Sequence, residues 1–405
     1  MTKVIVAGLI GRFPVGGNTW AYLQYVLGLK RLGYDVYYLE DSADFLCYDL
    51  DLNVTDRKFD YCINYLKNVM NAKIIGLANK WALRVGNECY GMSESEIVNL
   101  CKDTELLINV SGSVLVEPWV ANRWQEDGQL NMLSLERNEY KKINKRVFID
   151  TDPGFNQFKV ANDPEHKDHG SRSFASHDVY FTYAENIGAP DCGVPDCGFR
   201  WNKTRQPIIL DMWPSKIDPS LDKFTSVMNW SAYKPITYDS QIYGQKDVEL
   251  RKFIDLPHFT DQKIELAMSG GIKPKELLDQ GWKLVSGIAK ERRDMWAYQR
   301  YIQRSRAEWS VAKNIYVKTR SGWFSERSAC YLASAKPVLA QDTCFSKYLP
   351  TGEGLIAFSD MDGILNGIDL INSDYIFHCE ASRRIAEEYF DSDKVLKELL
   401  RQVGF

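Results

Sequence analysis

The chain has 405 residues, with 50 Lys and Arg against 54 Asp and Glu, and 45% of its residues are hydrophobic. At about 150 residues per domain, this length exceeds what one hydrophobic core usually carries, so we expect two globular domains. The formal net charge of −4 argues against a constitutive binder of nucleic acid or of anionic membranes. The hydrophobic content excludes a disordered chain.

The nine cysteines are spread along the chain without a CxxC pair. This usage is typical of a reducing compartment, and we expect a cytoplasmic protein. The apolar run at 3–10 is too short for the core of a signal peptide and has no cleavage site after it. No run approaches the ~20 apolar residues that cross a membrane, so we expect no transmembrane segment.

The first 40 residues predict a βαβ unit. Lys3–Leu9 is a short run rich in β-branched residues, as in a strand buried on both faces of a parallel sheet. A helical pattern follows from Gly17–Thr19 to Gly33, and Asp35–Glu40 predicts the second strand. Two parallel strands joined by a helix make a right-handed crossover in nearly all proteins.

The same alternation continues along the chain. Further strands are predicted at 106–110, 146–150 and 177–183, with helical patterns around 60–70 and 94–101. An open α/β sheet has this pattern. After the segment 189–219, which is rich in Pro, Gly and Trp, a second series of strands is predicted at 224–230, 264–268, 282–285, 337–340 and 354–358.

We therefore expect an α/β protein with two Rossmann-like domains. The first covers 1–205 and the second covers 206–385. The last residues, 386–405, are expected to form a C-terminal helix that packs back on the first domain.

The most informative stretch is 305–342. Ser321–Gly322 predicts a turn that opens a helix, with Ser325 as its N-cap. The free N–H groups and the positive dipole end of a helix suit a diphosphate, and Arg320 and Arg327 add cationic donors. An ordinary turn with an ordinary cap explains the local pattern about as well.

Further residues give this stretch a family resemblance. The small-residue helix before Lys336–Val338, the pair Gln341–Asp342 and the later Gly352–Gly354 resemble the nucleotide-sugar-binding half of GT-B glycosyltransferases. The resemblance implies two domains that face each other across a cleft, the second for a nucleoside diphosphate sugar and the first mainly for the acceptor. Together with the turn, it implies a donor site at Arg320, Ser321, Gly322, Trp323, Phe324, Ser325, Gln341 and Asp342.

One feature departs from this family. Retaining members often carry two glutamates eight positions apart before the Lys-Pro segment. Aligned on Lys336–Pro337, those positions hold Gly322 and Cys330, so neither glutamate is present. Retention or inversion at the anomeric carbon stays open. The pair Gln341–Asp342 resembles the polar pair that contacts donor-sugar hydroxyls in several inverting members.

The loop Gly11–Trp20 lies at the carboxyl end of the first predicted strand, where open α/β sheets bind ligands. It is not a GxGxxG motif, so a nicotinamide dinucleotide is not expected there. The neighbouring Gly16 and Gly17 permit close approach of the backbone to a ligand. The resemblance makes this cleft loop, with Gly16, Gly17 and Asn18, a lid over the donor phosphates and the acceptor. A simple helix start is the alternative.

Asp150–Gly154 follows another predicted strand. A carboxylate at this edge can take the proton of an acceptor hydroxyl as a general base, and we choose Asp152 over Asp150 for this catalytic role. A turn residue before Pro-Gly is the alternative for Asp152.

No metal site is predicted. His166 and His169 lie in a segment whose composition is explained by a solvated loop. Cys192 and Cys197 have no second pair at zinc-site spacing, so we expect structural thiols. We expect no cofactor, since the nucleoside diphosphate sugar is a co-substrate.

The sequence thus predicts a metal-independent glycosyltransferase that moves a sugar from a nucleoside diphosphate sugar, such as a UDP-sugar, to an unidentified acceptor. A nucleotide-sugar 2-epimerase of the same fold would turn over the donor without an acceptor. A non-catalytic nucleotide-sugar-binding homologue would bind without turnover. The expected partners are the donor and the acceptor, and the net charge does not favour nucleic acid as the acceptor.

Overall fold

The computed structural model describes residues 1–42, 47–49, 54–56, 60–114, 119–124, 130–135, 137–164, 174–231, 234–269, 274–286 and 293–405. They form two compact units. Unit 1 comprises Met1–Asp152, Lys159–Thr182 and Cys197–Asn202. Unit 2 comprises Pro153–Phe158, Tyr183–Asp196 and Lys203–Phe405.

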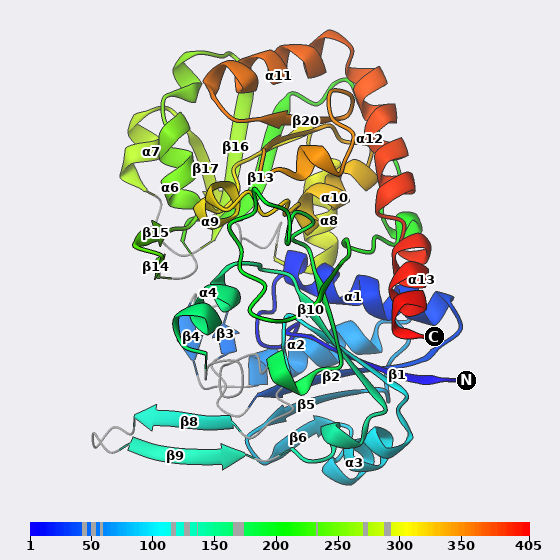
Figure 1. Cartoon of the computed structure of the whole chain (residues 1–405). Coiled ribbons are helices and arrows are strands. Elements are labelled where there is room, and N and C mark those ends of the chain that lie inside the picture. The colour runs from blue at the N-terminus through cyan, green and yellow to red at the C-terminus, as the bar shows by residue number, and fades with distance from the viewer. Residues whose placement is uncertain are drawn as a thin grey trace. The chain divides into compact units, whose positions relative to one another are not determined.

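In unit 1, the described strands form a sheet in the order β12-β11-β10-β7-β1-β2-β5-β6, of which Figure 1 labels β10, β1, β2, β5 and β6. The pairs of β1 with β2 and β7 are parallel, and β6 is antiparallel to β5. The bounds are β1 (Lys3–Ala7), β2 (Asp35–Ser42), β5 (Trp81–Val85), β6 (Glu88–Gly91), β7 (Leu106–Val110), β10 (Lys145–Asp150), β11 (Val179–Thr182) and β12 (Trp201–Lys203).

The first strand shows why this sheet forms. Val4–Ala7 is fully buried, as expected for a central parallel strand whose two faces are both covered. Ile5 and Ala7 pack in one cluster with residues of the neighbouring strands, Leu39 and Leu107. The remaining elements of this part of the chain are α1 (Gly16–Arg31), β3 (Cys47–Asp49), β4 (Val54–Asp56), α2 (Asp60–Asn71), α3 (Glu94–Asp103), β8 (Trp119–Trp124), β9 (Leu130–Leu135), η1 (Tyr140–Lys142), α4 (Phe155–Asn162) and η2 (Phe174–Ser176).

In unit 2, the main described sheet has the order β17-β16-β13-β18-β19-β20, and its pairs are parallel. The bounds are β13 (Lys223–Asn229), β16 (Lys263–Ser269), β17 (Lys283–Ser286), β18 (Ala307–Ser310), β19 (Val338–Gln341) and β20 (Leu355–Phe358), and β14 (Ile236–Tyr238) pairs with β15 (Gln241–Tyr243) in a separate hairpin.

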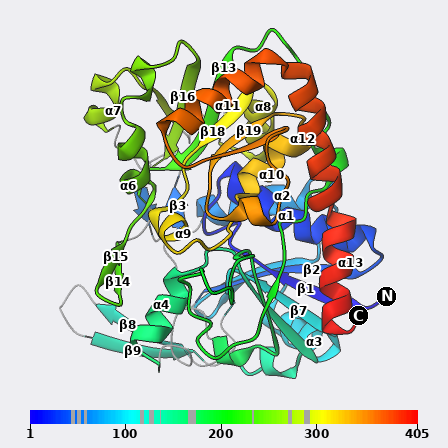
Figure 2. The same ribbon diagram turned by 45° about the horizontal axis from the view of Figure 1, so that its top comes forward.

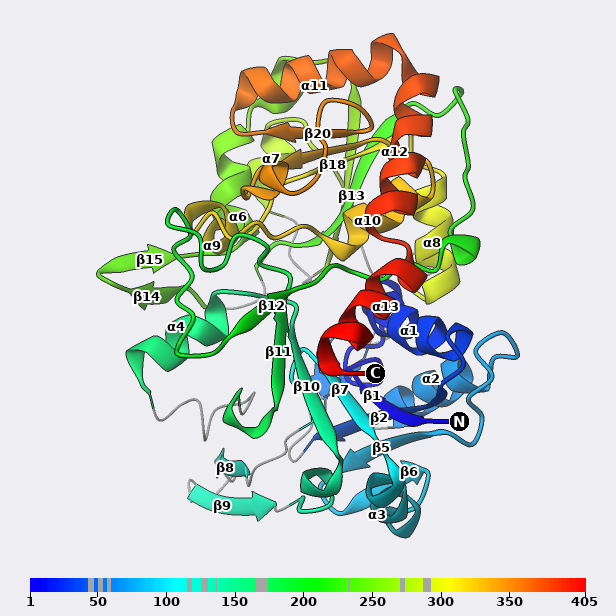
Figure 3. The same ribbon diagram turned by 45° about the vertical axis from the view of Figure 1, so that its right-hand side comes forward.

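The helices of unit 2 follow the strands in turn. In Figures 2 and 3, α12 leads into α13, which ends at the C-terminus. The bounds are η3 (Leu210–Met212), α6 (Lys246–Leu250), η4 (Arg251–Phe253), η5 (Leu256–His258), α7 (Lys275–Asp279), α8 (Met295–Gln303), α9 (Asn314–Lys318), α10 (Glu326–Ala333), η6 (Phe345–Lys347), α11 (Met361–Ser373), α12 (Tyr375–Tyr389) and α13 (Ser392–Val403). Packing of the C-terminal helix on the first domain stays a prediction.

Both sheets have the same topology. In each, the first three parallel strands extend to one side and the next strands extend to the other, which is the doubly wound order 3-2-1-4-5-6. The order reverses between β1 and β7 in unit 1 and between β13 and β18 in unit 2. The predicted α/β class with two Rossmann-like domains is confirmed, and ligands are expected at the carboxyl ends of the strands near these reversals.

The structure bears on two further expectations, which concern membrane-spanning segments and the state of the cysteines. Within the described ranges, no helix is long and apolar enough to cross a membrane. Seven described cysteines are free thiols, including Cys192 and Cys197. Cys62, however, is disulfide-bonded, which does not fit a reducing compartment.

Candidate active site in unit 2

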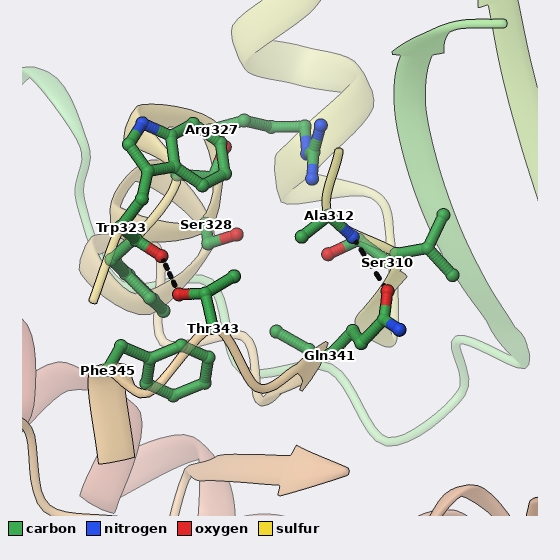
Figure 4. Close-up of a pocket in the computed structure, with 12 residues that line it drawn as sticks. Ser310, Ala312, Trp323, Arg327, Ser328, Gln341, Thr343 and Phe345 are labelled. Carbon is green, nitrogen blue, oxygen red and sulfur yellow. Dashed lines mark hydrogen bonds between the residues drawn. The ribbon is translucent and has the colours of Figure 1, made fainter. Parts of the chain in front are cut away.

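A hollow in unit 2 lies at the carboxyl ends of β18 and β19, beside the first turn of α10 (Figure 4). The neighbouring strand pair, β13 and β18, is the point where the strand order reverses. The hollow therefore occupies the position at which Rossmann-like sheets bind ligands. Its lining residues are Ser310, Val311, Ala312, Trp323, Phe324, Ser325, Arg327, Ser328, Ala340, Gln341, Thr343 and Phe345.

Arg327 is a buried cation at this position. Its Nη1 donates to the carbonyl of Val227 on β13 at 2.8 Å, and its Nε forms an ion pair with Glu308 on β18. Burial opposes the charged guanidinium, but Glu308, together with Tyr298 and Tyr331, raises the pKa of Arg327. Among the described residues, these bonds use two of the five N–H donors of Arg327, so the guanidinium keeps donors for a ligand.

Ser325 is the N-cap of α10, as predicted. Its backbone is extended, with φ −80° and ψ 135°, and its side chain makes no capping hydrogen bond. The first-turn N–H groups of a helix have no partner within the helix and carry part of the positive end of its dipole. Ser325 and Ser328, both in this turn, line the hollow, and Figure 4 shows the Ser328 hydroxyl between Arg327 and Thr343.

Gln341 lines the hollow from the end of β19, and its amide already has partners. Its Oε1 accepts from the Ala312 N–H at 3.2 Å, and its Nε2 donates to Glu249 at 2.5 Å. Glu249 is fully buried and also accepts from Asn314 at 2.7 Å and from Lys252 at 2.8 Å. Gln341 therefore ties the loop after β18 to the end of β19, which shapes the hollow.

Four predicted donor residues line the hollow, namely Trp323, Phe324, Ser325 and Gln341. Arg320, Ser321, Gly322 and Asp342 are not among its lining residues. Asp342 accepts from the Cys344 N–H at 2.8 Å and from the Ser346 hydroxyl at 2.7 Å, so its carboxylate organises the turn after β19.

Arg320 faces an acidic partner instead. Its guanidinium forms an ion pair with Asp191 at 3.0 Å, and 55% of its side chain is exposed. Asp191 also accepts from Lys347 at 2.6 Å. Hydrogen bonds from Lys347, Asn186 and Arg320 hold the pKa of Asp191 well below its usual range. Arg320 is thus a member of a surface ion-pair cluster.

The turn at Ser321–Gly322 is held by a segment that we call the strap, residues 183–196. Asn186 of the strap is fully buried; its N–H donates to the Ser321 carbonyl at 3.0 Å and its Nδ2 to the Arg320 carbonyl at 2.8 Å. The hydroxyl of Tyr348 donates to the Asn186 Oδ1 at 2.6 Å. The strap thereby positions the turn that leads into the hollow.

The strap also explains one missing glutamate. Gly322 has φ +77°, and a Cβ at this position would lie 2.6 Å from the backbone nitrogen of Asn186. Side chains other than glycine rarely adopt this backbone conformation. A glutamate at position 322 would therefore require both a different turn and a displaced strap.

In unit 1, the prediction of a loop through Gly16, Gly17 and Asn18 is wrong. These residues form the first turn of α1. The Asn18 side chain donates to the carbonyls of Leu9 at 2.7 Å and Phe13 at 2.9 Å, so the preceding loop folds back onto the helix start. The role of this region as a lid stays a prediction.

Asp152 lies on the bend after β10, half-buried, at the end of the first segment of unit 1. Asp150 is buried and accepts from the Thr182 hydroxyl at 3.3 Å. Asp150 is the last residue of β10 and Asp152 follows it by two residues, and the general-base role of Asp152 stays a prediction.

In the part of the chain that the structure describes, no group of three His, Cys, Asp or Glu could hold a metal ion. His166 and His169 lie outside the described residues. The lining residues that the sequence did not assign to the site are Ser310, Val311, Ala312, Ser328, Ala340, Thr343 and Phe345. The available signal for Ser310–Ala312 and for Thr343 is their place at or just after the carboxyl end of a strand.

No protein-family model matches the chain, and no curated protein matches its sequence. Solved structures do match. An alpha-glucosyltransferase in complex with UDP and a 13-mer DNA aligns at a TM-score of 0.57 and 11% identity, over 100% of this chain and 99% of that chain. Anabaena HepE in complex with UDP and glucose aligns at a TM-score of 0.54 and 10% identity, over 99% of each chain.

The chain has the fold of GT-B glycosyltransferases. A third example is the sucrose-phosphate synthase of Thermosynechococcus elongatus, at a TM-score of 0.50 and 14% identity over 99% of each chain. At these identities the likeness concerns the fold. The fold that the resemblance implied is thereby confirmed, whereas the activity depends on the residues of the site.

Proposed function

We propose that the protein is a glycosyltransferase that moves a sugar from a nucleoside diphosphate sugar to a separate acceptor. The observation that carries this proposal is the hollow in unit 2, which combines the N-terminus of α10, the buried Arg327 and the reversal of strand order. Helix N-termini at this place in Rossmann-like sheets bind diphosphates through backbone N–H groups.

The proposed chemistry uses this positive site for the leaving group. As the acceptor oxygen bonds to the anomeric carbon, the bond from that carbon to the diphosphate oxygen breaks and negative charge grows on the diphosphate. The first turn of α10 and Arg327 stabilise that charge, which lowers the barrier. The acceptor proton goes to a general base, for which Asp152 remains our candidate.

We propose UDP as the nucleotide of the donor. The alpha-glucosyltransferase and HepE structures that share this fold are complexes with UDP, and HepE also with glucose. One of these complexes holds DNA. We do not propose DNA as the acceptor of this chain, because its net charge of −4 disfavours binding to the DNA phosphates.

Independence from metals and cofactors belongs to the same proposal. The N-terminus of α10 and the guanidinium donors of Arg327 that its ion pair with Glu308 does not use already offer hydrogen bonds to a diphosphate. A chelator should therefore leave turnover unchanged. A cytoplasmic location is also proposed; the seven free thiols support it, and the disulfide at Cys62 counts against it.

The test is titration calorimetry of UDP, ADP and GDP into the full chain, followed by incubation with UDP-sugars with and without candidate acceptors. We expect saturable binding of UDP and donor consumption that depends on the acceptor. Consumption without acceptor would indicate the 2-epimerase. Binding without consumption would indicate a non-catalytic homologue, and failure of all three diphosphates to bind would contradict the proposal.

A further inference from the structure

Glu40 is a buried carboxylate at the carboxyl end of β2 in unit 1, with 2% of its surface exposed. It faces the loop that follows β1. Its Oε1 accepts from the Gly11 N–H at 2.6 Å, and its Oε2 accepts from the Arg12 N–H at 3.2 Å. Tyr38, two residues earlier on the same strand, donates its hydroxyl to Oε1 at 2.7 Å.

Three successive backbone N–H groups of the loop donate hydrogen bonds to the side chains of Tyr38 and Glu40. The Ile10 N–H donates to the Tyr38 hydroxyl at 3.0 Å, and the next two donate to Glu40. Successive N–H groups that converge in this way form a concave site for negative charge. In this loop the charge comes from the protein's own carboxylate, so Glu40 determines the loop conformation.

The loop is packed tightly against these two side chains. A Cβ at Gly11 would lie 3.3 Å from a Glu40 oxygen, and a Cβ at Gly8 would lie 2.6 Å from the Tyr38 hydroxyl. The glycines at both positions are therefore explained by the carboxylate and the phenol. The loop lies at the carboxyl end of β1, next to the reversal of strand order in unit 1, where ligands are expected.

We propose that ionised Glu40 is a positioning residue that holds Ile10–Arg12 in the conformation used for ligand binding by unit 1, and that its protonation releases the Arg12 amide. The inference rests on the proposed function, since the ligand would be a substrate of the transfer. An ionised carboxylate accepts from all three donors. A neutral acid keeps its carbonyl oxygen for Gly11 and Tyr38, but its O–H faces the Arg12 N–H, a second donor.

The surroundings of Glu40 make this change accessible near neutral pH. Burial raises the pKa of Glu40 to about 7, against the opposing effects of the Gly11 N–H, the Tyr38 hydroxyl and Arg12. Among the described residues, the charged or titratable groups that act on the pair are Arg12 on the loop and Tyr22 on α1, which acts on Tyr38. From α2, the apolar Leu66 lies beside Gly11.

The experiment is hydrogen exchange at the Gly11 and Arg12 amides in the full chain without donor or acceptor, from pH 5.5 to 8.5, corrected for intrinsic rates. We expect protection of Arg12 in the wild type to fall about tenfold on acidification through pH 7, the effect of losing one charge-assisted hydrogen bond. In Glu40→Gln, the amide N–H₂ replaces one oxygen, so Arg12 should be poorly protected at every pH.

Ile5→Val is the control, because Ile5 lies on β1 in the core of unit 1 and this change weakens the core without removing a hydrogen bond to Glu40. In Ile5→Val, protection of the Arg12 amide should still fall on acidification through pH 7. If the Arg12 amide of Glu40→Gln is protected as in the wild type and shows the same fall near pH 7, the proposal is overturned. If Glu40→Gln does not fold, Tyr38→Phe is tested in its place. Loss of the Tyr38 hydroxyl, which donates to Glu40, should move the fall in Arg12 protection to a higher pH. A fall at the same pH as in the wild type would overturn the proposal.

The two proposals fail separately. Exchange is measured without ligand, so a negative result leaves the proposed transfer untouched. Absence of UDP binding would contradict the proposed transfer and leave the exchange result standing.

Discussion

Arg327 and Arg320 lie close in sequence at one turn, yet their surroundings differ. Arg327 is buried beside the hollow, whereas Arg320 is mostly exposed and pairs with Asp191. We predict that Arg327→Lys weakens UDP binding about ten- to a hundredfold, because an ammonium cannot replace the forked guanidinium donors. Arg320→Ala should change the affinity less than about threefold, since an exposed ion pair contributes little.

Titration calorimetry of both variants with UDP makes the comparison, with melting temperature as the check on folding. A large loss of UDP affinity in Arg320→Ala with none in Arg327→Lys would contradict this prediction. It would indicate that Arg320 binds the diphosphate, as the sequence alone suggested.

Ser325 allows stability and binding to be separated. Its hydroxyl leaves the first turn of α10 uncapped, so Ser325→Asp adds a side-chain cap and a favourable charge at the helix N-terminus. We predict that Ser325→Asp keeps or raises the melting temperature, by up to about 1 kcal/mol of stability, and weakens UDP binding more than tenfold through repulsion of the diphosphate. The neutral Ser325→Asn should bind UDP nearly as the wild type does. Equal UDP affinity in the Asp and Asn variants would exclude the α10 terminus as the phosphate site.

Glu40 makes the stability of the chain depend on pH. Its folded-state pKa of about 7 is raised above the ordinary value of 4.5, so the folded state holds this proton longer than the unfolded state. Its contribution is therefore full below pH 4.5 and is lost as pH rises through 7, at up to about 1.4 kcal/mol per pH unit. In urea unfolding at pH 5 and pH 8, Glu40→Gln should lose less stability than the wild type over this interval. An identical loss in both would contradict the raised pKa.

Among the elements, the strap (183–196) holds the turn before the hollow through the buried side chain of Asn186. Asn186→Ala removes three side-chain hydrogen bonds, which link Asn186 to the Arg320 carbonyl, the Tyr348 hydroxyl and the Asp191 carboxylate. We predict a loss of about 1–3 kcal/mol in the free energy of unfolding and weaker UDP binding, because the turn is no longer held. Urea unfolding and calorimetry measure the two effects.

Asn202→Ala is the matched control for the strap, since its side chain donates to the Tyr180 carbonyl at 3.1 Å within unit 1. It should cost comparable stability and leave UDP binding unchanged. Equal effects of Asn186→Ala and Asn202→Ala on UDP affinity would contradict the role of the strap.

Most central strands could be predicted from their continuous apolar runs, and two important ones could not. β5 and β18 were missed because each has only five residues or fewer and a charge within that short run, Arg84 and Glu308 respectively. Both charges have partners far along the chain: Arg84 pairs with Glu139, and Glu308 pairs with Arg327. Such pairs have no signal in local periodicity.

The candidate site was predicted in part for similar reasons. The turn before α10 and its N-cap follow from local residue types, so Ser325 was found. Gly16–Gly17 looked like a loop, but the Asn18 side chain stabilises a helix start by bonding the preceding carbonyls. The sequence indicates Glu40 only as the end of a strand, because two of its three donors, the Gly11 and Arg12 N–H groups, come from a loop that is near it only in the folded structure.

At the scale of the whole molecule, the chain enters unit 2 more than once. Unit 2 contains 153–158 and 183–196 in addition to the chain from 203 onward. Phe158 from the first of these segments stacks on Tyr238 with ring centroids 4.5 Å apart. We predict that a fragment spanning 206–405 lacks a cooperative unfolding transition and UDP binding, because both segments are absent from it. Calorimetric unfolding of this fragment beside the full chain is the measurement, and a fragment that unfolds cooperatively and binds UDP would contradict the prediction.

The proposed transfer requires that unit 2 bind the diphosphate of a nucleotide sugar at α10. A crystal structure of the full chain with UDP shows whether it does. We predict phosphate oxygens about 3 Å from the first-turn N–H groups of α10 and from the Arg327 guanidinium. UDP bound in unit 1, or in unit 2 away from α10, would contradict the account.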